Sequence, residues 1–240
     1  MILIYDIRLP QEYADALKAC LYNCVFYPLD MSERSSVYAS IISHPDIYFF
    51  QADSKTLVHA PIVSDKFLSA LSKNGIVLIK GSSDPSGRYP ETVRYNAVRV
   101  GGSVFLNEKH ADSAVSKIMK DRGLKIIPVN QGYARCSVLL AGDNAIVTSD
   151  EGIAYRAKET GIDALLIKPG HILLPEESHG FIGGASGNMP DGRTVILGDL
   201  DLHPDGMSIR DFVAAHGTKL MELKGLPLYD AGSLIFVDGE

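Results

Sequence analysis

DIYFFQADSKTLVHA (residues 46–60) and NAVRVGGSVFL (residues 96–106) share one pattern, and this pattern decides the fold. In each stretch, an apolar run of strand length leads into a short polar turn, and a second apolar run follows. The turns contain Asp53 in the first stretch and Gly101-Gly102 in the second, which are residues that tight hairpins prefer. Each stretch therefore predicts a β-hairpin at the start of a longer unit.

The longer unit is completed by an amphipathic helix and a third apolar run. In the first two units the expected helices cover 64–73 and 109–122, followed by GIVLIKG (75–81) and LKIIPV (124–129). The third unit begins at Cys136 with SVLLA, and continues with a turn at 142–144, AIVT, a helix over 150–160 and DALLIKPG. A looser fourth copy has GGASGNM, a turn at Asp191-Gly192, TVILG, a helix over 207–216 and KLMEL. The repeat predicts successive ββαβ units.

The ends of the chain contain a fifth unit that is split in two. SLIFV (233–237) matches a first strand, while ILIYDI (2–7), a helix over 11–20 and VFYPL (25–29) match the remainder. Pairing of the first and last strands closes a ring and hides its edges. We therefore predict a single α/β domain over residues 1–240, a five-bladed ββαβ propeller closed by the terminal strands. An ordinary α/β sandwich with accidental internal similarity is the alternative.

Composition excludes several classes of protein. The 240 residues include 23 Lys+Arg and 29 Asp+Glu, which gives a net charge of −6. A mildly acidic chain without a basic stripe is a poor binder of nucleic acid. No apolar run approaches the roughly 20 residues of a membrane span, and no signal peptide is recognisable, so we expect a cytoplasmic protein. Cys20 and Cys24 are expected to be reduced core thiols.

Metals and cofactors are not expected. Cys20 and Cys24 lack a second Cys/His pair that would complete a zinc site. GDLDLHPDG (198–206) is rich in aspartate, but the twelfth position counted from Asp199 is Arg210 rather than the glutamate that a calcium loop needs. The partner expected from the sequence is a small molecule.

Five ββαβ units closed by the chain termini resemble the pentein fold. Its members include arginine deiminases, dimethylarginine hydrolases and amidinotransferases, and a ribosome anti-association factor shares the architecture without catalysis. The resemblance implies a cysteine nucleophile at the start of the final unit, a histidine in the loop before the fourth unit, and acidic residues that hold a guanidinium. His179 resembles the family base, whereas the final unit, residues 228–233, contains no cysteine. The sequence therefore departs from the standard deiminase or amidinotransferase pattern.

One thiol stands at the start of a unit. Cys136 lies one unit length after Asn96, and Asp46 is the counterpart of both in the first unit. Equivalent positions of a ring converge on its axis, so these residues and the segment 230–233 are expected to line one pocket. Cys136 then acts as a nucleophile, with Arg135 or a protonated histidine favouring the thiolate. The alternative is a small buried apolar residue at the start of a strand.

The histidines offer proton transfer. If residues 44–46 are extended, His44 and Asp46 point the same way, and Asp46 provides a charge-assisted acceptor for a guanidinium or amidine. These two residues shape a turn in the alternative interpretation. His179 is either a general acid/base or an exposed loop residue.

Two functions follow as hypotheses. The first is an enzyme that modifies a guanidine or amidine group, of the hydrolase or amidinotransferase type. Its catalytic residues are expected to be Cys136, His179 and His44, and its substrate-binding residues Asp46, Asn96, Arg135 and Asp230. The second is a non-catalytic pentein that binds a small molecule or a protein, which the missing cysteine of the final unit favours.

Overall fold

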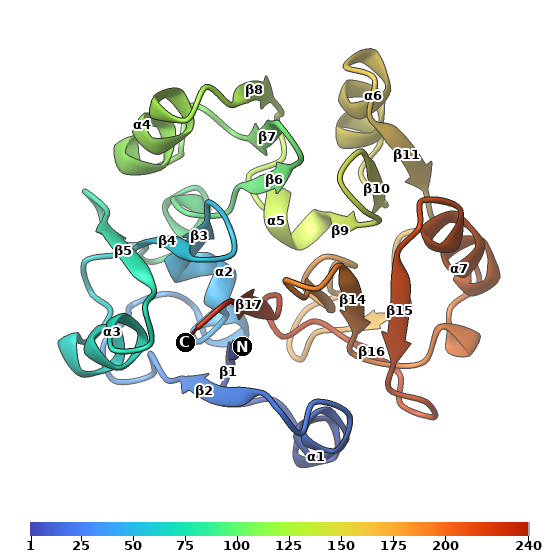
Figure 1. The fold of residues 1–240 in the computed structure, drawn as a ribbon, viewed down its shortest axis with the longest axis horizontal. Helices are drawn as coiled ribbons and strands as arrows, with labels where there is room; N and C mark the ends of the chain where they lie inside the picture. Colours follow the sequence, from blue (N-terminus) through green and yellow to red (C-terminus); the bar gives the residue numbers. More distant parts are fainter. Residues whose placement is uncertain (240) are drawn as a thin grey trace.

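The computed structural model describes residues 1–239, and the strands of this part form five three-stranded sheets of one design, together with one additional strand pair. In each sheet the first strand of the unit pairs antiparallel with the second, and the second pairs parallel with the third. A helix connects the second strand to the third. Figure 1 shows the five units arranged around a common centre, with the first strands innermost.

The elements follow the repeat closely. The first unit has β3 (Phe49–Gln51), β4 (Thr56–His59), α3 (Asp65–Ser72) and β5 (Val77–Lys80). The second has β6 (Val98–Val100), β7 (Ser103–Leu106), α4 (Ser113–Asp121) and β8 (Lys125–Pro128). The third has β9 (Leu139–Leu140), β10 (Ala145–Thr148), α6 (Glu151–Glu159) and β11 (Asp163–Leu166). The fourth has β13 (Ser186–Asn188), β14 (Arg193–Ile196), α7 (Gly206–Ala215) and β15 (Lys219–Glu222). The additional pair is β12 (Ile172–Leu173) with β16 (Leu228–Tyr229), and short 3₁₀ helices are η1 (Ala39–Ile41), η2 (Glu91–Val93) and η3 (Leu200–Leu202).

The fifth sheet joins the two ends of the chain. It contains β17 (Ile235–Val237), β1 (Ile2–Asp6), α1 (Gln11–Cys20) and β2 (Val25–Leu29). β1 pairs antiparallel with β17, with Ile2 opposite Val237, and parallel with β2, with Ile2 opposite Val25. The N- and C-terminal strands therefore lie side by side at the centre of the molecule (Figure 1).

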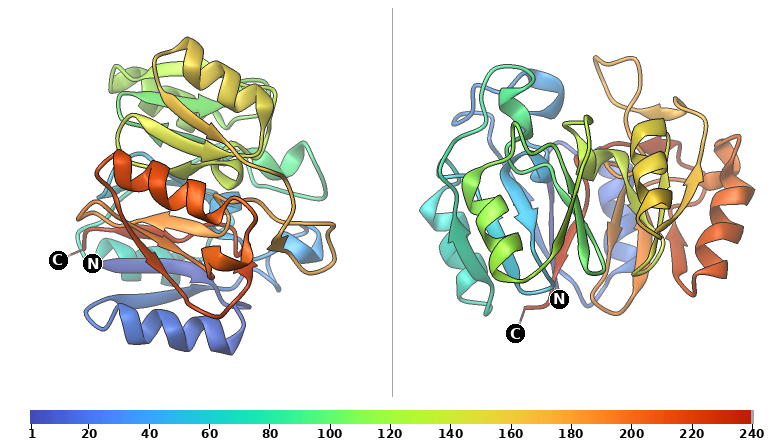
Figure 2. Two further views of the ribbon diagram at one scale, coloured as in Figure 1. Left: turned by 90° about the vertical axis from the view of Figure 1, so that its right-hand side faces the viewer. Right: turned by 90° about the horizontal axis from the view of Figure 1, so that it is seen from above.

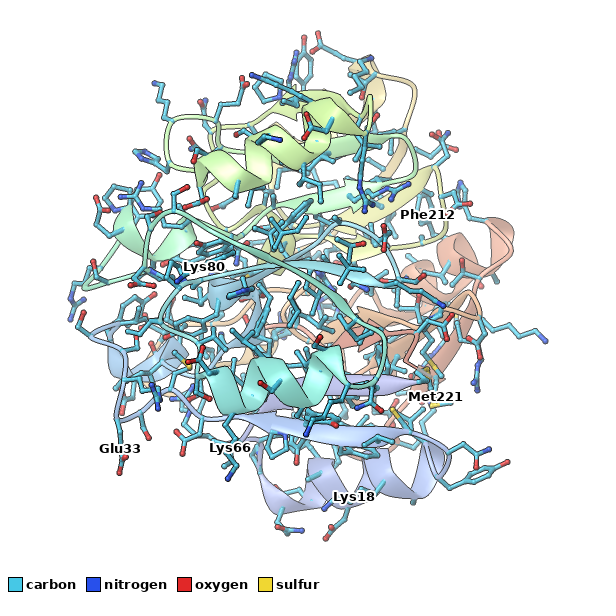
Figure 3. The ribbon with its side chains drawn as sticks, turned by 60° about the vertical axis from the view of Figure 1, so that its left-hand side comes forward. Lys18, Glu33, Lys66, Lys80, Phe212 and Met221 are labelled. Atoms are coloured by element: carbon cyan, nitrogen blue, oxygen red, sulfur yellow. The ribbon has the colours of Figure 1, made fainter. Side chains whose placement is uncertain are left out.

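Capping residues and burial explain why the helices form where they do. Ser64 precedes α3, and its hydroxyl accepts a hydrogen bond from the backbone N–H of Phe67. Asp112 caps α4 through Ala114 N, so this helix starts at Ser113 and not at 109 as the sequence indicated. The helices cover the outside of the sheets (Figure 2), and Lys18 and Lys66 point away from α1 and α3 into solvent (Figure 3).

Two expectations about local structure are wrong. Residues 44–46 are not extended, because Pro45 opens the short helix α2 (Pro45–Tyr48), where its fixed φ suits the first helical position. Cys20 is exposed and Cys24 is half-buried, so the prediction of core thiols fails for Cys20. Helix α1 ends at Cys20 and buries Tyr13, Ala14 and Leu17 instead. Within residues 1–239, no helix is long and apolar enough to cross a membrane.

The two ends of the molecule carry different kinds of loop. The turn of the first hairpin lies beside the C-terminus, where Asp238 N donates to Ser54 O at 2.7 Å. The long loops that precede the units gather at the opposite end, which is the upper end in the right-hand view of Figure 2. Each first strand therefore begins near the long loops and finishes near the hairpin turns. Residues at the starts of the units meet at the end with the long loops.

Candidate active site

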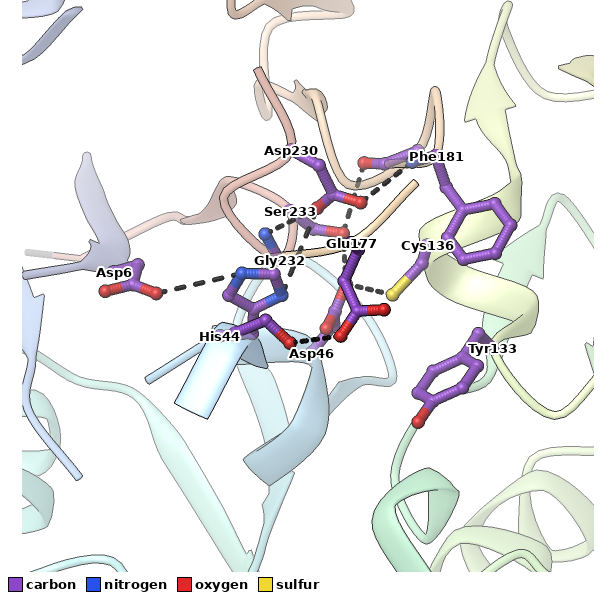
Figure 4. A network of polar contacts seen from close by, with 12 residues as sticks. Asp6, His44, Asp46, Tyr133, Cys136, Glu177, Phe181, Asp230, Gly232 and Ser233 are labelled. Atoms are coloured by element: carbon purple, nitrogen blue, oxygen red, sulfur yellow. Dashed lines mark hydrogen bonds and ion pairs between the residues drawn. The ribbon is translucent and has the colours of Figure 1, made fainter. Parts of the chain in front are cut away.

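A buried polar cluster lies where the units begin. Asp46 comes from α2, Asn96 lies two residues before β6, and Cys136 lies in the short helix α5 (Ala134–Ser137). Cys136 Sγ donates to Asp46 Oδ2 at 3.0 Å, and Asn96 Nδ2 donates to Cys136 Sγ at 3.2 Å. Each of the three side chains is almost completely buried. The structure thus brings together one carboxylate, one amide and one thiol from three successive units, of which Figure 4 shows the carboxylate of Asp46 and the thiol of Cys136.

Ser233 is a member of the cluster that the sequence did not single out. Its hydroxyl lies 2.6 Å from Asp46 Oδ2, to which it donates, and its backbone has a φ of 69°. A non-glycine residue in this left-handed region is uncommon and is often found at functional sites. Ser233 begins the final unit, as Asp46, Asn96 and Cys136 begin theirs. That equivalence placed the segment 230–233 in the expected pocket, although Ser233 itself was not named as a site residue.

His44 lies between two buried carboxylates. Its Nε2 is 3.8 Å from Asp6 Oδ2, and its Nδ1 is 4.0 Å from Asp230 Oδ1. Asp230 also accepts hydrogen bonds from Phe181 N at 2.8 Å and Gly232 N at 2.9 Å. Asp6, the last residue of β1, carries no sequence signal, because only the pairing of the chain ends brings it to His44. Figure 4 shows this imidazole between its two carboxylates.

Burial controls the protonation of these groups. Burial raises the pKa of the Cys136 thiol well above its usual value, and the negative charges of Asp46 and Asp230 raise it further. The pKa of Asp230 rises to about 7, mainly through burial and then through the charge of Asp46. Burial lowers the pKa of His44 to about 4, although Asp46 opposes this shift. At neutral pH the cluster therefore holds a neutral thiol and a neutral imidazole.

Asp46 retains one unused acceptor. Within residues 1–239, its Oδ1 atom is buried and accepts no hydrogen bond, while Oδ2 accepts from both Cys136 and Ser233. A buried polar atom without a partner costs about 1–3 kcal/mol. A bound group with N–H donors would remove this cost.

Arg135 is placed differently from the other predicted substrate-binding residues. Its guanidinium donates to the carbonyls of Val138 at 2.9 Å, Gly183 at 3.3 Å and Ser186 at 3.3 Å. Burial lowers its pKa, and the charges of Asp46, Cys136 and Asp230 oppose that effect. The Arg135 side chain therefore acts on the cluster through its charge, while it lines a separate cavity towards the hairpin turns.

His179 does not join the cluster. Its Nδ1 lies 3.0 Å from the carbonyl of the adjacent Gly180, and its ring packs edge-on against Phe181 with centroids 6.0 Å apart. Among the described residues, it makes no hydrogen bond to the thiol or the carboxylates. The loop that contains it is attached across the site, because Ser40 Oγ donates to Glu177 Oε1 at 2.7 Å. Of the two candidate histidines, the structure places His44 among the buried polar groups.

Aromatic side chains flank the thiol. Tyr133 and Phe181 stack with centroids 6.4 Å apart, and Figure 4 shows both beside Cys136. Tyr38 contributes a hydroxyl 3.2 Å from that of Tyr133, and the guanidinium of Arg88 lies 5.5 Å from the Tyr38 ring centroid. Aromatic faces of this kind attract cations.

A cavity of about 260 Å³ opens beside His44. Asp6 and Arg8 line it together with Tyr229, and Glu176 contributes from the loop above. Arg8 is held by Asp6 through two of its guanidinium nitrogens, so the pair forms a fixed wall. The volume suits a small molecule, and His44 and Asp6 are buried polar side chains of its lining.

The chain shares its fold with solved structures of two amidinotransferases and a deiminase. SxtG, an amidinotransferase of saxitoxin biosynthesis from Microseira wollei, has 10% identity and a TM-score of 0.58, over 100% of this chain and 94% of that one. The inosamine-phosphate amidinotransferase StrB1 from Streptomyces griseus has 9% identity and a TM-score of 0.59, over 95% and 80%. The agmatine deiminase of C. jejuni has 12% identity and a TM-score of 0.56, over 99% and 93%.

At the level of sequence, residues 4–235 match a family of unknown function, DUF6873. The chain belongs to this family. A search of curated protein sequences gives no significant match.

Proposed function

We propose that the protein is an enzyme that modifies guanidine or amidine groups, of the hydrolase or amidinotransferase type, and that its five units form the five-bladed propeller of that fold. The observation that carries the proposal is the hydrogen bond from the Cys136 thiol to Asp46, whose second carboxylate oxygen has no donor within residues 1–239. A nucleophile and an unsatisfied acceptor lie side by side.

A guanidinium or amidinium fits the charge of this site. It is a planar cation whose N–H groups pair with carboxylates in a fixed geometry. Asp46 Oδ1 would accept one N–H, and Asp230, whose pKa is raised to about 7, would ionise more readily beside the cation. The faces of Tyr133 and Phe181 provide a surface on which the planar cation stacks.

The same cation would activate the thiol. A positive charge next to Cys136 offsets the carboxylates that raise its pKa, so substrate binding itself favours the thiolate. The thiol proton passes to Asp46 at 3.0 Å. Sulfur then bonds to the central carbon of the guanidinium or amidinium.

Collapse of the resulting tetrahedral adduct breaks one C–N bond. The leaving amine takes the proton from Asp46, and Cys136 retains an amidino-thioether from a guanidine or a thioimidate from an amidine. Water or an acceptor amine attacks that carbon in the second half, and the C–S bond breaks. His44, neutral at pH 7 and flanked by Asp6 and Asp230, accepts the proton of the attacking group. Asn96 supports the departing thiolate through its N–H donor at 3.2 Å.

A non-catalytic pentein is the second candidate. It is favoured by Ser233, which stands at the start of the final unit where the family pattern has a cysteine. The carboxylates and aromatic rings would then bind a guanidino compound without turning it over. The two candidates share a ligand and differ in whether Cys136 becomes covalently modified.

Turnover of a guanidino panel tests the proposal. Arginine, agmatine and guanidinoacetate are incubated with the protein, with and without glycine as an amidino acceptor, and ureido products and transferred amidino groups are measured. Cys136→Ser should abolish any turnover and any covalent adduct seen by intact-mass spectrometry. Cys20→Ser is the matched control, because that thiol is exposed and remote, and it should leave both unchanged. Turnover that survives in Cys136→Ser would refute the assigned nucleophile, and binding without adduct or turnover would establish the second candidate.

A further inference from the structure

A second cavity lies at the end of the molecule that carries the hairpin turns. Its volume is about 270 Å³. Each of the five sheets contributes a first-strand residue to its wall, namely Gln51, Arg99, Leu140, Asn188 and Phe236. The turn residues Ser54 and Gly142 border it, whereas the cluster around Cys136 lies where the same strands begin. This cavity is therefore separate from the candidate active site.

Two guanidinium groups line the cavity without carboxylate partners. Arg99 donates to the carbonyls of Gly101 at 2.8 Å and Ala52 at 2.7 Å. Arg135 donates to three carbonyls from the opposite side. Within residues 1–239, neither side chain forms an ion pair with Asp or Glu. Partly buried cations that lack a counter-charge are unfavourable unless an anion compensates them.

The acidic residues of the wall do not supply that compensation. Asp53 is already paired with Arg122, which lies outside the cavity lining, and accepts a hydrogen bond from Lys55 N. Asp143 is the other carboxylate of the lining. With Asp53 neutralised by Arg122, the lining has two arginines against one remaining carboxylate, Asp143, and so keeps one positive charge. The charges of Asp46 and Asp230 act on Arg135 from the side of the candidate active site.

The cavity wall also contains a neutral hydrogen-bond acceptor, which restricts the class of ligand that fits. Asn188 directs its amide N–H groups to Leu140 O at 3.1 Å and Thr194 Oγ1 at 2.7 Å. Its Oδ1 atom is buried and, among the described residues, has no hydrogen-bond donor. A ligand that pairs with this oxygen must donate a hydrogen bond, while a ligand that pairs with Arg99 and Arg135 must carry negative charge.

We propose that this cavity binds a small oxyanion that also carries a hydroxyl group, as monohydrogen phosphate and hydroxycarboxylates do. The anionic oxygens accept from Arg99 and Arg135, and the hydroxyl donates to Asn188 Oδ1. The cavity is then a second ligand site, at the opposite end of the central strands from Cys136. Binding there does not depend on the proposed enzymatic function.

The site would communicate with the thiol through one residue. Arg135 immediately precedes Cys136, and its backbone N–H donates to Asn96 Oδ1 at 2.8 Å. Its positive charge lies close enough to act on Asp46 and Asp230. An anion on Arg135 cancels part of this charge and disfavours the Cys136 thiolate. The bound oxyanion therefore acts as an inhibitor of chemistry at Cys136, and ionisation of Cys136 in turn weakens the binding of the oxyanion.

Binding is tested by calorimetry on the full chain at pH 7, with inorganic phosphate, glycolate and acetate as probes. Phosphate and glycolate should bind, and glycolate should bind more tightly than acetate, which lacks the hydroxyl. Arg99→Gln should weaken binding on the order of tenfold or more, as expected for a lost charge-assisted contact. Arg156→Gln is the matched control, because this partly exposed arginine on α6 does not line the cavity.

Each outcome decides the matter. Absence of binding of both phosphate and glycolate to the wild-type chain would overturn the proposal, as would equal binding by Arg99→Gln. If Arg99→Gln does not fold, the wild-type titrations still test the proposal. The charge-preserving Arg99→Lys then serves as the second variant, and its binding constants should lie within a few-fold of the wild-type values. Saturating glycolate should also slow alkylation of Cys136 several-fold. Failure of the enzymatic proposal would leave the binding data unaffected, so the two can be told apart.

Discussion

Asp46 is the residue whose replacement most directly tests the chemistry of the site. Asp46→Asn keeps the shape of the side chain but removes the charge that accepts hydrogen bonds from Cys136 and Ser233. It also removes the charge that would hold a guanidinium or amidinium. A hydrogen bond to a charged group contributes about 1.5–3 kcal/mol, which corresponds to roughly a 10- to 100-fold change in a rate or binding constant. The preference of the site for a cationic reagent should fall by this factor.

The assay compares two alkylating reagents of nearly equal shape. Chloroacetamidine is a cation, and chloroacetamide is its neutral counterpart. Their second-order rates with Cys136 are measured by intact-mass spectrometry in a Cys20→Ser/Cys24→Ser background, since Cys20 is exposed and would react first. Wild type should favour the cation, and Asp46→Asn should lose this preference, because the carboxylate that would hold the cation is gone.

A matched carboxylate controls for net charge. Asp121→Asn, on the exposed surface of α4, removes the same charge far from the site and should leave the ratio of rates unchanged. An unchanged ratio in Asp46→Asn would refute the assignment of Asp46 as the cation acceptor.

Three further predictions concern stability and access. Asp230, with its pKa raised to about 7, contributes stability that is lost as pH rises from about 4 to 7. His44, with its pKa lowered to about 4, contributes stability that is lost as pH falls from 6.5 to 4. The two contributions to the pH dependence of the unfolding free energy therefore oppose each other. Asp230→Asn should therefore expose a rise in stability with pH of up to about 1.4 kcal/mol per unit between pH 4.5 and 6, measured by urea unfolding, and a flat profile would contradict the assignment. Ser40→Ala removes the hydrogen bond to Glu177 and should speed both proteolysis of the loop over 174–182 and alkylation of Cys136 by a few-fold. The unfolding free energy of the whole protein should fall by less than about 1 kcal/mol. Equal proteolysis rates in the variant and the wild type would exclude this contact as the attachment of the loop. Gly232→Ala places a methyl group against His44 at a φ of 69° and should destabilise the fold by more than about 2 kcal/mol in thermal or urea unfolding, which a wild-type midpoint would contradict.

The sequence predicted the repeated elements well because each unit carries its own local signals. Alternating hairpin and helix patterns, turn residues such as Gly101, and caps such as Ser64 act over a few residues and need no knowledge of the rest of the chain. The starts of the units were equally informative, since one repeat length separates Asn96 from Cys136. The contact between the two side chains follows from that equivalence.

What the sequence could not reveal depends on contacts between distant segments. Asp6 reaches His44 only because β1 and β17 pair and bring the fifth unit beside the first. His179 matched a family position along the chain, yet its ring packs on Phe181, and the loop geometry that decides this has no local signature. Pro45 could have indicated the helical turn at Asp46, because proline at a first helical position is a recognised start signal.

The pairing of β1 with β17 has a consequence for synthesis of the protein. Asp6 is synthesised well before Ser233, yet both belong to one cluster. Until β17 emerges, the nascent chain carries β1 with one edge unpaired, and such an edge readily joins a strand of another molecule. The central cluster is therefore completed only after β17 has been synthesised, and until then the nascent chain exposes both an unpaired strand edge and a site that lacks Ser233.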